Sequence, residues 1–102
     1  MKITLQSHEY DFMLSVLKHI DKKSYDPVYK NLSERIEKTS SKIGNNQRLV
    51  AIEESEVFVT IDALNEYIDD AQTGNYKQEE KKDRTSKAED FIQIIASETG
   101  IR

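Results

Sequence analysis

The fold class is decided by the stretch KITLQSHEYDFMLSVLKHI, residues 2–20, in which a strand pattern runs directly into a helix pattern. Residues 2–6 alternate polar and apolar side chains, as a half-buried strand does. Ser7 is suited to cap a helix that we expect to reach about Ile20. The apolar residues of this helix cover more than half of its circumference, which predicts a central position in the core.

A second helix is predicted from Pro27 to about Ile43, because Asp26-Pro27 has the pattern of a helix start. Its apolar residues form a narrow seam at helical spacing, namely Tyr29, Leu32, Ile36 and Ile43. Such a seam on an otherwise charged helix fits one-sided packing against the first helix. If the seam instead faced solvent, it would form a dimer interface or a groove for a partner.

The composition changes after Gly44 towards residues that favour strands. Two apolar runs, residues 49–52 and 57–61, flank the polar segment Glu53-Glu54-Ser55. This arrangement predicts a β-hairpin whose turn lies at residues 53–55. Asp62 then caps a third predicted helix that runs through about Thr73.

Residues 75–85 contain one large apolar residue, Tyr76, and are predicted to form a flexible linker, with an exposed helical extension as the alternative. The last helix should begin near Ser86, because Ser86 and Glu89 have capping-box spacing. The resulting order is β-α-α-β-β-α-α. We therefore predict a single α+β domain over residues 1–102, a small three-stranded sheet packed with about four helices on one face.

The composition of the 102-residue chain indicates the cellular compartment in which it acts. It has no cysteine, which favours a reducing compartment, and no apolar run of signal-peptide or membrane-spanning length. Its net charge of −4 disfavours a general nucleic-acid binder. We expect a cytoplasmic protein that does not associate with membranes.

The sequence offers little catalytic chemistry. Its three isolated glycines cannot form a phosphate-binding loop, and the motifs of serine hydrolases and zinc proteases are missing. The two histidines, His8 and His19, would lie roughly 16 Å apart along one helix, too far to share a metal ion. We predict that the chain is not an enzyme and uses no catalytic residue, metal or cofactor.

The best candidate for a protein-binding surface is acidic. Residues 53–70 contain no basic residue and seven acidic ones, namely Glu53, Glu54, Glu56, Asp62, Glu66, Asp69 and Asp70. Such a surface can present phosphate-like charge to a basic partner, although a merely solvated face is the simpler interpretation. We hypothesise a non-catalytic protein-binding module, an adaptor or inhibitor, with homodimerisation as a further alternative.

The alternative hypothesis is a small nucleic-acid-binding regulator. Its contact face would lie on the second helix and comprise Lys30, Arg35, Lys38 and Lys42. Interleaved acids at Asp26, Glu34 and Glu37 weigh against it, and lysine outnumbers arginine 11 to 4, although arginine is the preferred reader of bases. Binding of this kind would weaken steeply with salt.

The general character of the chain resembles the small accessory proteins of bacteriophages and mobile elements in Gram-positive bacteria. The resemblance rests on the opening Met-Lys-Ile-Thr-Leu strand, the abundance of lysine, glutamate, isoleucine and asparagine, the small size and the missing cysteine. It involves no motif, so no functional residue follows from it. It implies binding to a host protein and modulation of that protein.

Overall fold

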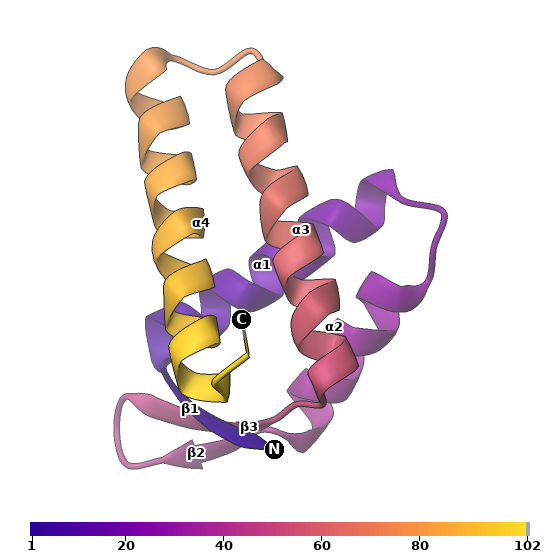
Figure 1. The fold of residues 1–102 in the computed structure, drawn as a ribbon, viewed down its shortest axis with the longest axis vertical. Helices are drawn as coiled ribbons and strands as arrows, with labels where there is room; N and C mark the ends of the chain where they lie inside the picture. The colour runs from indigo at the N-terminus through magenta and orange to yellow at the C-terminus, as the bar shows by residue number, and fades with distance from the viewer. Residues whose placement is uncertain (102) are drawn as a thin grey trace.

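The computed structural model describes residues 1–101 and has the predicted α+β class, with four helices and a three-stranded antiparallel sheet in the order β-α-α-β-β-α-α (Figure 1). Along the chain the elements are β1 (Lys2–Gln6), α1 (Ser7–Lys23), α2 (Val28–Thr39), β2 (Ser41–Ile43), β3 (Gln47–Ala51), α3 (Glu54–Thr73) and α4 (Gln78–Thr99).

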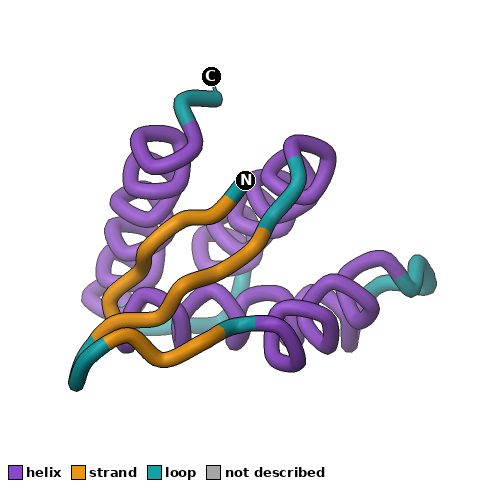
Figure 2. Tube along the Cα trace, turned by 90° about the horizontal axis from the view of Figure 1, so that it is seen from below, coloured by secondary structure: helices purple, strands orange, loops and turns teal. Residues whose placement is uncertain are grey.

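The sheet has the strand order β1-β3-β2, and β3 pairs antiparallel with both neighbours. Ile3 faces Val50 across the β1–β3 pair, and both side chains are fully buried. Thr4 and Lys2 point to the opposite side and are exposed, as alternation along a strand requires. Figure 2 shows the strands lying across one side of the helices, so that one face of the sheet is covered.

Helix α1 is the centre of the core, as its apolar circumference predicts. It packs against α2, α3, β1 and β3, and Met13, Leu17 and Ile20 have no exposed surface. Phe12 contacts Tyr67 of α3 and Phe91 of α4 edge to face, at ring distances of 5.7 and 5.9 Å. This aromatic cluster connects α1 to the two long helices.

The second helix is shorter than predicted. It begins at Val28, whose backbone N–H donates to the Asp26 carboxylate, and it ends at Thr39 instead of Ile43. Ser40 is extended, and Gly44 has a φ of +64°, a conformation that glycine adopts without strain. Residues 41–43 therefore form β2, which turns through Gly44-Asn45-Asn46 and pairs with β3.

The predicted position of the hairpin, with its turn at residues 53–55, is wrong. Residues 57–61 are not a strand but lie in α3, which begins at Glu54, eight residues before the predicted start at Asp62. On a helix, Val57, Thr60 and Leu64 fall on one face, and all three are buried. Burial of this face outweighs the local preference of valine and isoleucine for strands.

Helix α4 also begins earlier than predicted. Residues 74–77 connect it to α3, and residues 78–85, expected as part of a linker, form its first two turns. Arg84 lies over the ring of Tyr76 at 4.3 Å, which packs the connection against the helix. The helix ends at Thr99, and Gly100 takes the left-handed conformation that closes helix C-termini.

The central position of α1 leads to a stability prediction. Replacing Leu17 by alanine removes a fully buried side chain, and we expect it to lower the free energy of unfolding by about 2–5 kcal/mol. Tyr25→Ala changes a fully exposed side chain in the α1–α2 loop and should stay within about 0.5 kcal/mol of the wild type. Urea unfolding followed by circular dichroism measures both. Equal effects of the two substitutions would contradict the assigned core.

Candidate protein-binding groove

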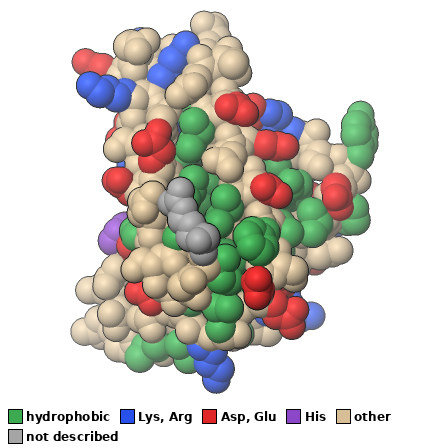
Figure 3. Space-filling view, viewed as in Figure 1, with side chains coloured by type: hydrophobic (Ala, Val, Ile, Leu, Met, Phe, Trp, Pro, Cys, Tyr) green, Lys and Arg blue, Asp and Glu red, His purple; other side chains and the backbone are tan. Residues whose placement is uncertain are grey.

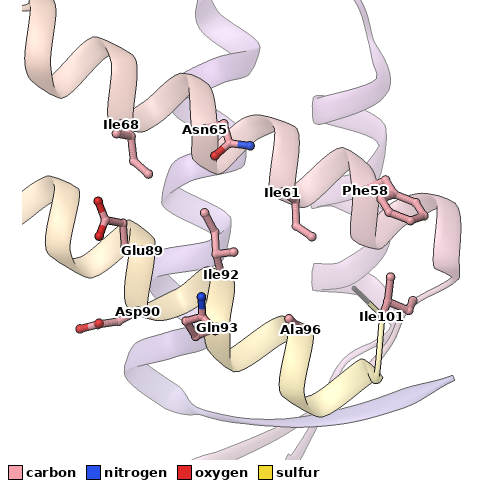
Figure 4. A pocket seen from close by; sticks show the side chains of 10 residues that line it. All are labelled: Phe58, Ile61, Asn65, Ile68, Glu89, Asp90, Ile92, Gln93, Ala96 and Ile101. Carbon is pink, nitrogen blue, oxygen red and sulfur yellow. The ribbon is translucent and has the colours of Figure 1, made fainter.

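A groove runs between α3 and α4 and is lined largely by apolar side chains of both helices. Its volume is about 640 Å³. Ile61 and Ile68 of α3 and Ile92 of α4 point into it, and Phe58 and Ile101 lie together at one end (Figure 4). In the space-filling view a band of apolar side chains follows the junction of the two helices (Figure 3).

The apolar side chains of this groove are incompletely covered. Phe58 is 50% exposed, and Ile61, Ile68, Ile92 and Ile101 are half-buried. A half-exposed phenylalanine beside several partly exposed isoleucines forms a contiguous apolar surface, whereas single exposed apolar residues are common on any protein. Burial of this surface by a partner would therefore be favourable.

Acidic and amide side chains border the groove. Glu89, Asp90 and Gln93 line it from α4, and Asn65 lines it from α3. Asp62 lies one helical turn after Phe58, and Asp69 lies one turn after Asn65. Both aspartates are exposed. Figure 3 shows acidic side chains on both sides of the apolar band. The groove thus combines an apolar centre with a negatively charged border.

The seven acidic residues predicted as one face have different environments in the structure. Glu54, Asp62, Glu66 and Asp69 are exposed on α3. Glu53 precedes α3, and the carboxylates of Glu56 and Asp70 are engaged by basic side chains within the chain. The four exposed carboxylates on α3 are therefore available to a partner, whereas Glu56 and Asp70 are engaged within the chain.

Glu56 has a structural role. Its carboxylate accepts a hydrogen bond from the Glu53 backbone N–H at 2.9 Å, at the start of α3. It also accepts two hydrogen bonds from Arg35 of α2, one of them from Nε at 2.8 Å. The same guanidinium donates to the backbone carbonyl of Ala51 at 3.0 Å, at the end of β3.

The predicted nucleic-acid face is not a single basic surface. Arg35 is held by Glu56 and Ala51, and Lys42 lies on β2 and not on the second helix. Lys30 and Lys38 are exposed on α2. A shared phosphate-binding face on α2 is thus reduced to two lysines, which weakens the nucleic-acid hypothesis.

The predicted seam on the second helix is mostly internal. Leu32 and Ile36 are buried in the core, and Tyr29 is half-buried. Ile43 is not part of the seam, because it lies on β2 and is 39% exposed. Leu32 and Ile36 therefore pack in the core, as the one-sided packing of the seam predicts, and the alternative of a solvent-facing interface along this helix retains only Tyr29.

Asp70 connects the ends of α1 and α3. Its carboxylate pairs with the Lys23 ammonium and, at 3.2 Å, with Nε2 of His19. Partial burial raises the pKa of Asp70, but the hydrogen bonds and positive charges of Lys23 and His19 outweigh it and hold the pKa below its ordinary value.

Two further features of the described chain limit its chemistry. Within residues 1–101, no three His, Asp or Glu side chains are grouped so that they could hold a metal ion. Across the same residues, no helix combines the length and the apolar character needed to cross a membrane.

The prediction of a strand at residues 57–61 hides the groove, because a strand does not place Phe58, Ile61, Asn65 and Ile68 on one side. On a helix, Phe58, Ile61, Asn65 and Ile68 follow a 3-4-3 spacing and lie on one side. These residues lie next to the buried side of α3 formed by Val57, Thr60 and Leu64, and they form a second, largely apolar side of the helix. A helical interpretation of residues 54–73 would have revealed it.

Comparison of the chain with models of protein families, with curated proteins and with solved structures found no significant match. The functional interpretation therefore depends on the residues and geometry described above.

Asp70 provides a prediction for the dependence of stability on pH. Because its folded pKa is lowered, its ion pairs stabilise the fold above the ordinary carboxyl value of 3.8 and lose this effect as the pH falls through the folded value. Asp70→Asn should lower the free energy of unfolding at pH 7 by up to about 1 kcal/mol, with the difference vanishing in acid.

Urea unfolding of wild type and Asp70→Asn at several pH values measures this difference. Asp69→Asn is the matched control, because Asp69 is the exposed neighbour on the same helix. A destabilisation by Asp70→Asn that persists unchanged in acid would show that the ion pairs are not its cause.

Proposed function

We propose that this chain is a non-catalytic protein-binding module that contacts its partner through the α3–α4 groove. The observation that supports this most directly is the contiguous, partly exposed apolar surface of Phe58, Ile61, Ile68 and Ile92. Interfaces differ from ordinary surface by an apolar centre with aromatic residues and a polar border, and this groove has both. Phe58, half-exposed at one end, is the residue we expect to contribute most.

The four exposed acids of α3 contribute to the proposed surface in different degrees. Asp62 and Asp69 are exposed one helical turn from the groove residues Phe58 and Asn65, and Glu54 and Glu66 are exposed elsewhere on α3. Their role in the proposal is to select a partner and to accelerate its association, since exposed charges at the edge of an interface affect the rate of encounter more than the final affinity.

The setting and effect of this binding are also part of the proposal. Absence of cysteine supports action in the cytoplasm. The resemblance to accessory proteins of phages and mobile elements supports modulation or inhibition of the bound protein as the outcome. A chain of this size can act simply by covering a surface that its partner needs.

Affinity capture from nuclease-treated bacterial lysate at moderate salt tests this function. We expect the tagged wild type to recover one protein near stoichiometry, and Phe58→Ser to lose it. Tyr25→Ser is the matched control, because it removes an exposed aromatic residue of the α1–α2 loop that does not line the groove, and it should retain the protein. Recovery of no protein, or of nucleic acid alone when nuclease is omitted, would contradict the proposal.

A further inference from the structure

The walls of the groove determine which backbone conformation a partner can use there. Both walls are α-helices, whose backbone N–H and C=O groups are already paired within each helix. An extended peptide in the groove would find no strand edge to pair with, and its own backbone groups would be left unsatisfied on desolvation. A helical segment satisfies its backbone internally and therefore fits this site.

The length of the apolar part sets the size of that segment. Phe58 and Ile68 mark its extent along α3 and are ten residues apart, which corresponds to about 15 Å. A bound helix of about three turns spans this distance, with apolar side chains one turn apart on one side. The 640 Å³ of the groove accommodates a few such side chains but not a whole helix, so the outer side of the bound helix stays in solvent.

The charges around the groove predict which charged side chains the bound helix carries on its flanks. Glu89 and Asp90 of α4 line one side of the groove, and Asp62 and Asp69 of α3 are exposed one helical turn from Phe58 and Asn65 on the other side. Beyond Glu89, towards the connection of the two helices, a polar hollow is lined by Lys81 and Lys82, so positive charge adjoins the groove at that end. Lysine and arginine on both flanks of a bound helix would face these carboxylates.

A second copy of this chain is a poor occupant. In a two-fold dimer formed through the groove, the same surface of both copies is buried, so the interface would hold two copies of the carboxylates of Asp62, Asp69, Glu89 and Asp90. Like charges brought together at an interface disfavour association. The observed charges therefore favour a different partner over self-association.

We propose that the α3–α4 groove binds an amphipathic helix of a partner protein, about three turns long, with apolar residues on one side and lysine or arginine on its flanks. This inference rests on the proposed function and specifies the chemistry of the partner. Phe58, Ile61, Ile68 and Ile92 contact the apolar side of that helix, and the four bordering carboxylates contact its basic flanks.

The test uses a synthetic helical peptide of about 15 residues, long enough for three turns with ends, carrying leucine on one side and lysine on the flanks. A matched peptide carries glutamate in place of every lysine, and a third has the lysine peptide's composition in scrambled order. Binding to the full chain is followed by amide shifts in NMR spectra at physiological salt.

We expect saturable binding of the lysine peptide alone, with shifts confined to groove residues of α3 and α4. The double variant Asp62→Lys with Glu89→Lys should weaken it about tenfold or more, and Phe58→Ser by a similar factor. Glu34→Lys, which reverses an exposed acid on α2, and Tyr25→Ser should leave binding within about twofold, since both lie away from the groove.

Several outcomes would overturn the inference. These are equal binding of the lysine, glutamate and scrambled peptides, shifts outside the groove, and equal weakening by Glu34→Lys. Self-association of the free chain through the groove, detected by light scattering and lost in Phe58→Ser, would overturn it in favour of a dimer. A further outcome is a protein that is captured by the wild type, lost with Phe58→Ser, and yet not displaced by an excess of the lysine peptide. That result would refute binding of a basic helix and leave the proposed protein-binding function intact.

Discussion

The contact of Arg35 with Glu56 and Ala51 is the constraint on which the rest of the structure depends. One guanidinium joins the middle of α2, the end of β3 and the first turn of α3. The two-point pairing of guanidinium and carboxylate restricts orientation as well as distance. Glu56 in turn accepts the Glu53 backbone N–H, so the same carboxylate places the start of α3 next to α2.

The position of this start has consequences along the whole of α3. With the helix beginning at Glu54, the side of Val57, Thr60 and Leu64 faces the core, and the adjacent side of Phe58, Ile61 and Ile68 faces α4. The second side is only partly covered and becomes the groove. Phe12 of α1, in contact with Tyr67 and Phe91, helps to hold the two walls in place.

Part of this arrangement could be predicted from the sequence, and the successes share one cause. Residues 2–6 and the helix that follows have unambiguous periodicity, and both form as predicted. The element order also agrees, although the hairpin is formed by residues 41–43 and 47–51 and not by 49–52 and 57–61. Prediction failed where local preference and tertiary packing disagree. Residues 57–61 favour a strand by composition, yet they are helical because burial against the core compensates. Residues 41–43 had the spacing of a helix but pair with β3.

The site was harder to predict than the fold, because charge counts do not reveal which charges are paired. Arg35 and Glu56 were assigned to two different candidate surfaces, and the structure pairs them with each other. The groove depends on the placement of α3 beside α4, which no local pattern encodes. Helical spacing alone places Asp62, Glu66 and Asp69 on one side of α3, and all three are exposed.

A double-mutant cycle on Arg35→Ala and Glu56→Ala, measured by urea unfolding, tests this dependence most directly. If the pair anchors α3 to α2 and β3, the effects of the two substitutions on the free energy of unfolding should be coupled by about 1 kcal/mol or more. The reason is that the contact is bidentate and only partly exposed to solvent. Additive effects, with a coupling below about 0.5 kcal/mol, would contradict the central role of this contact.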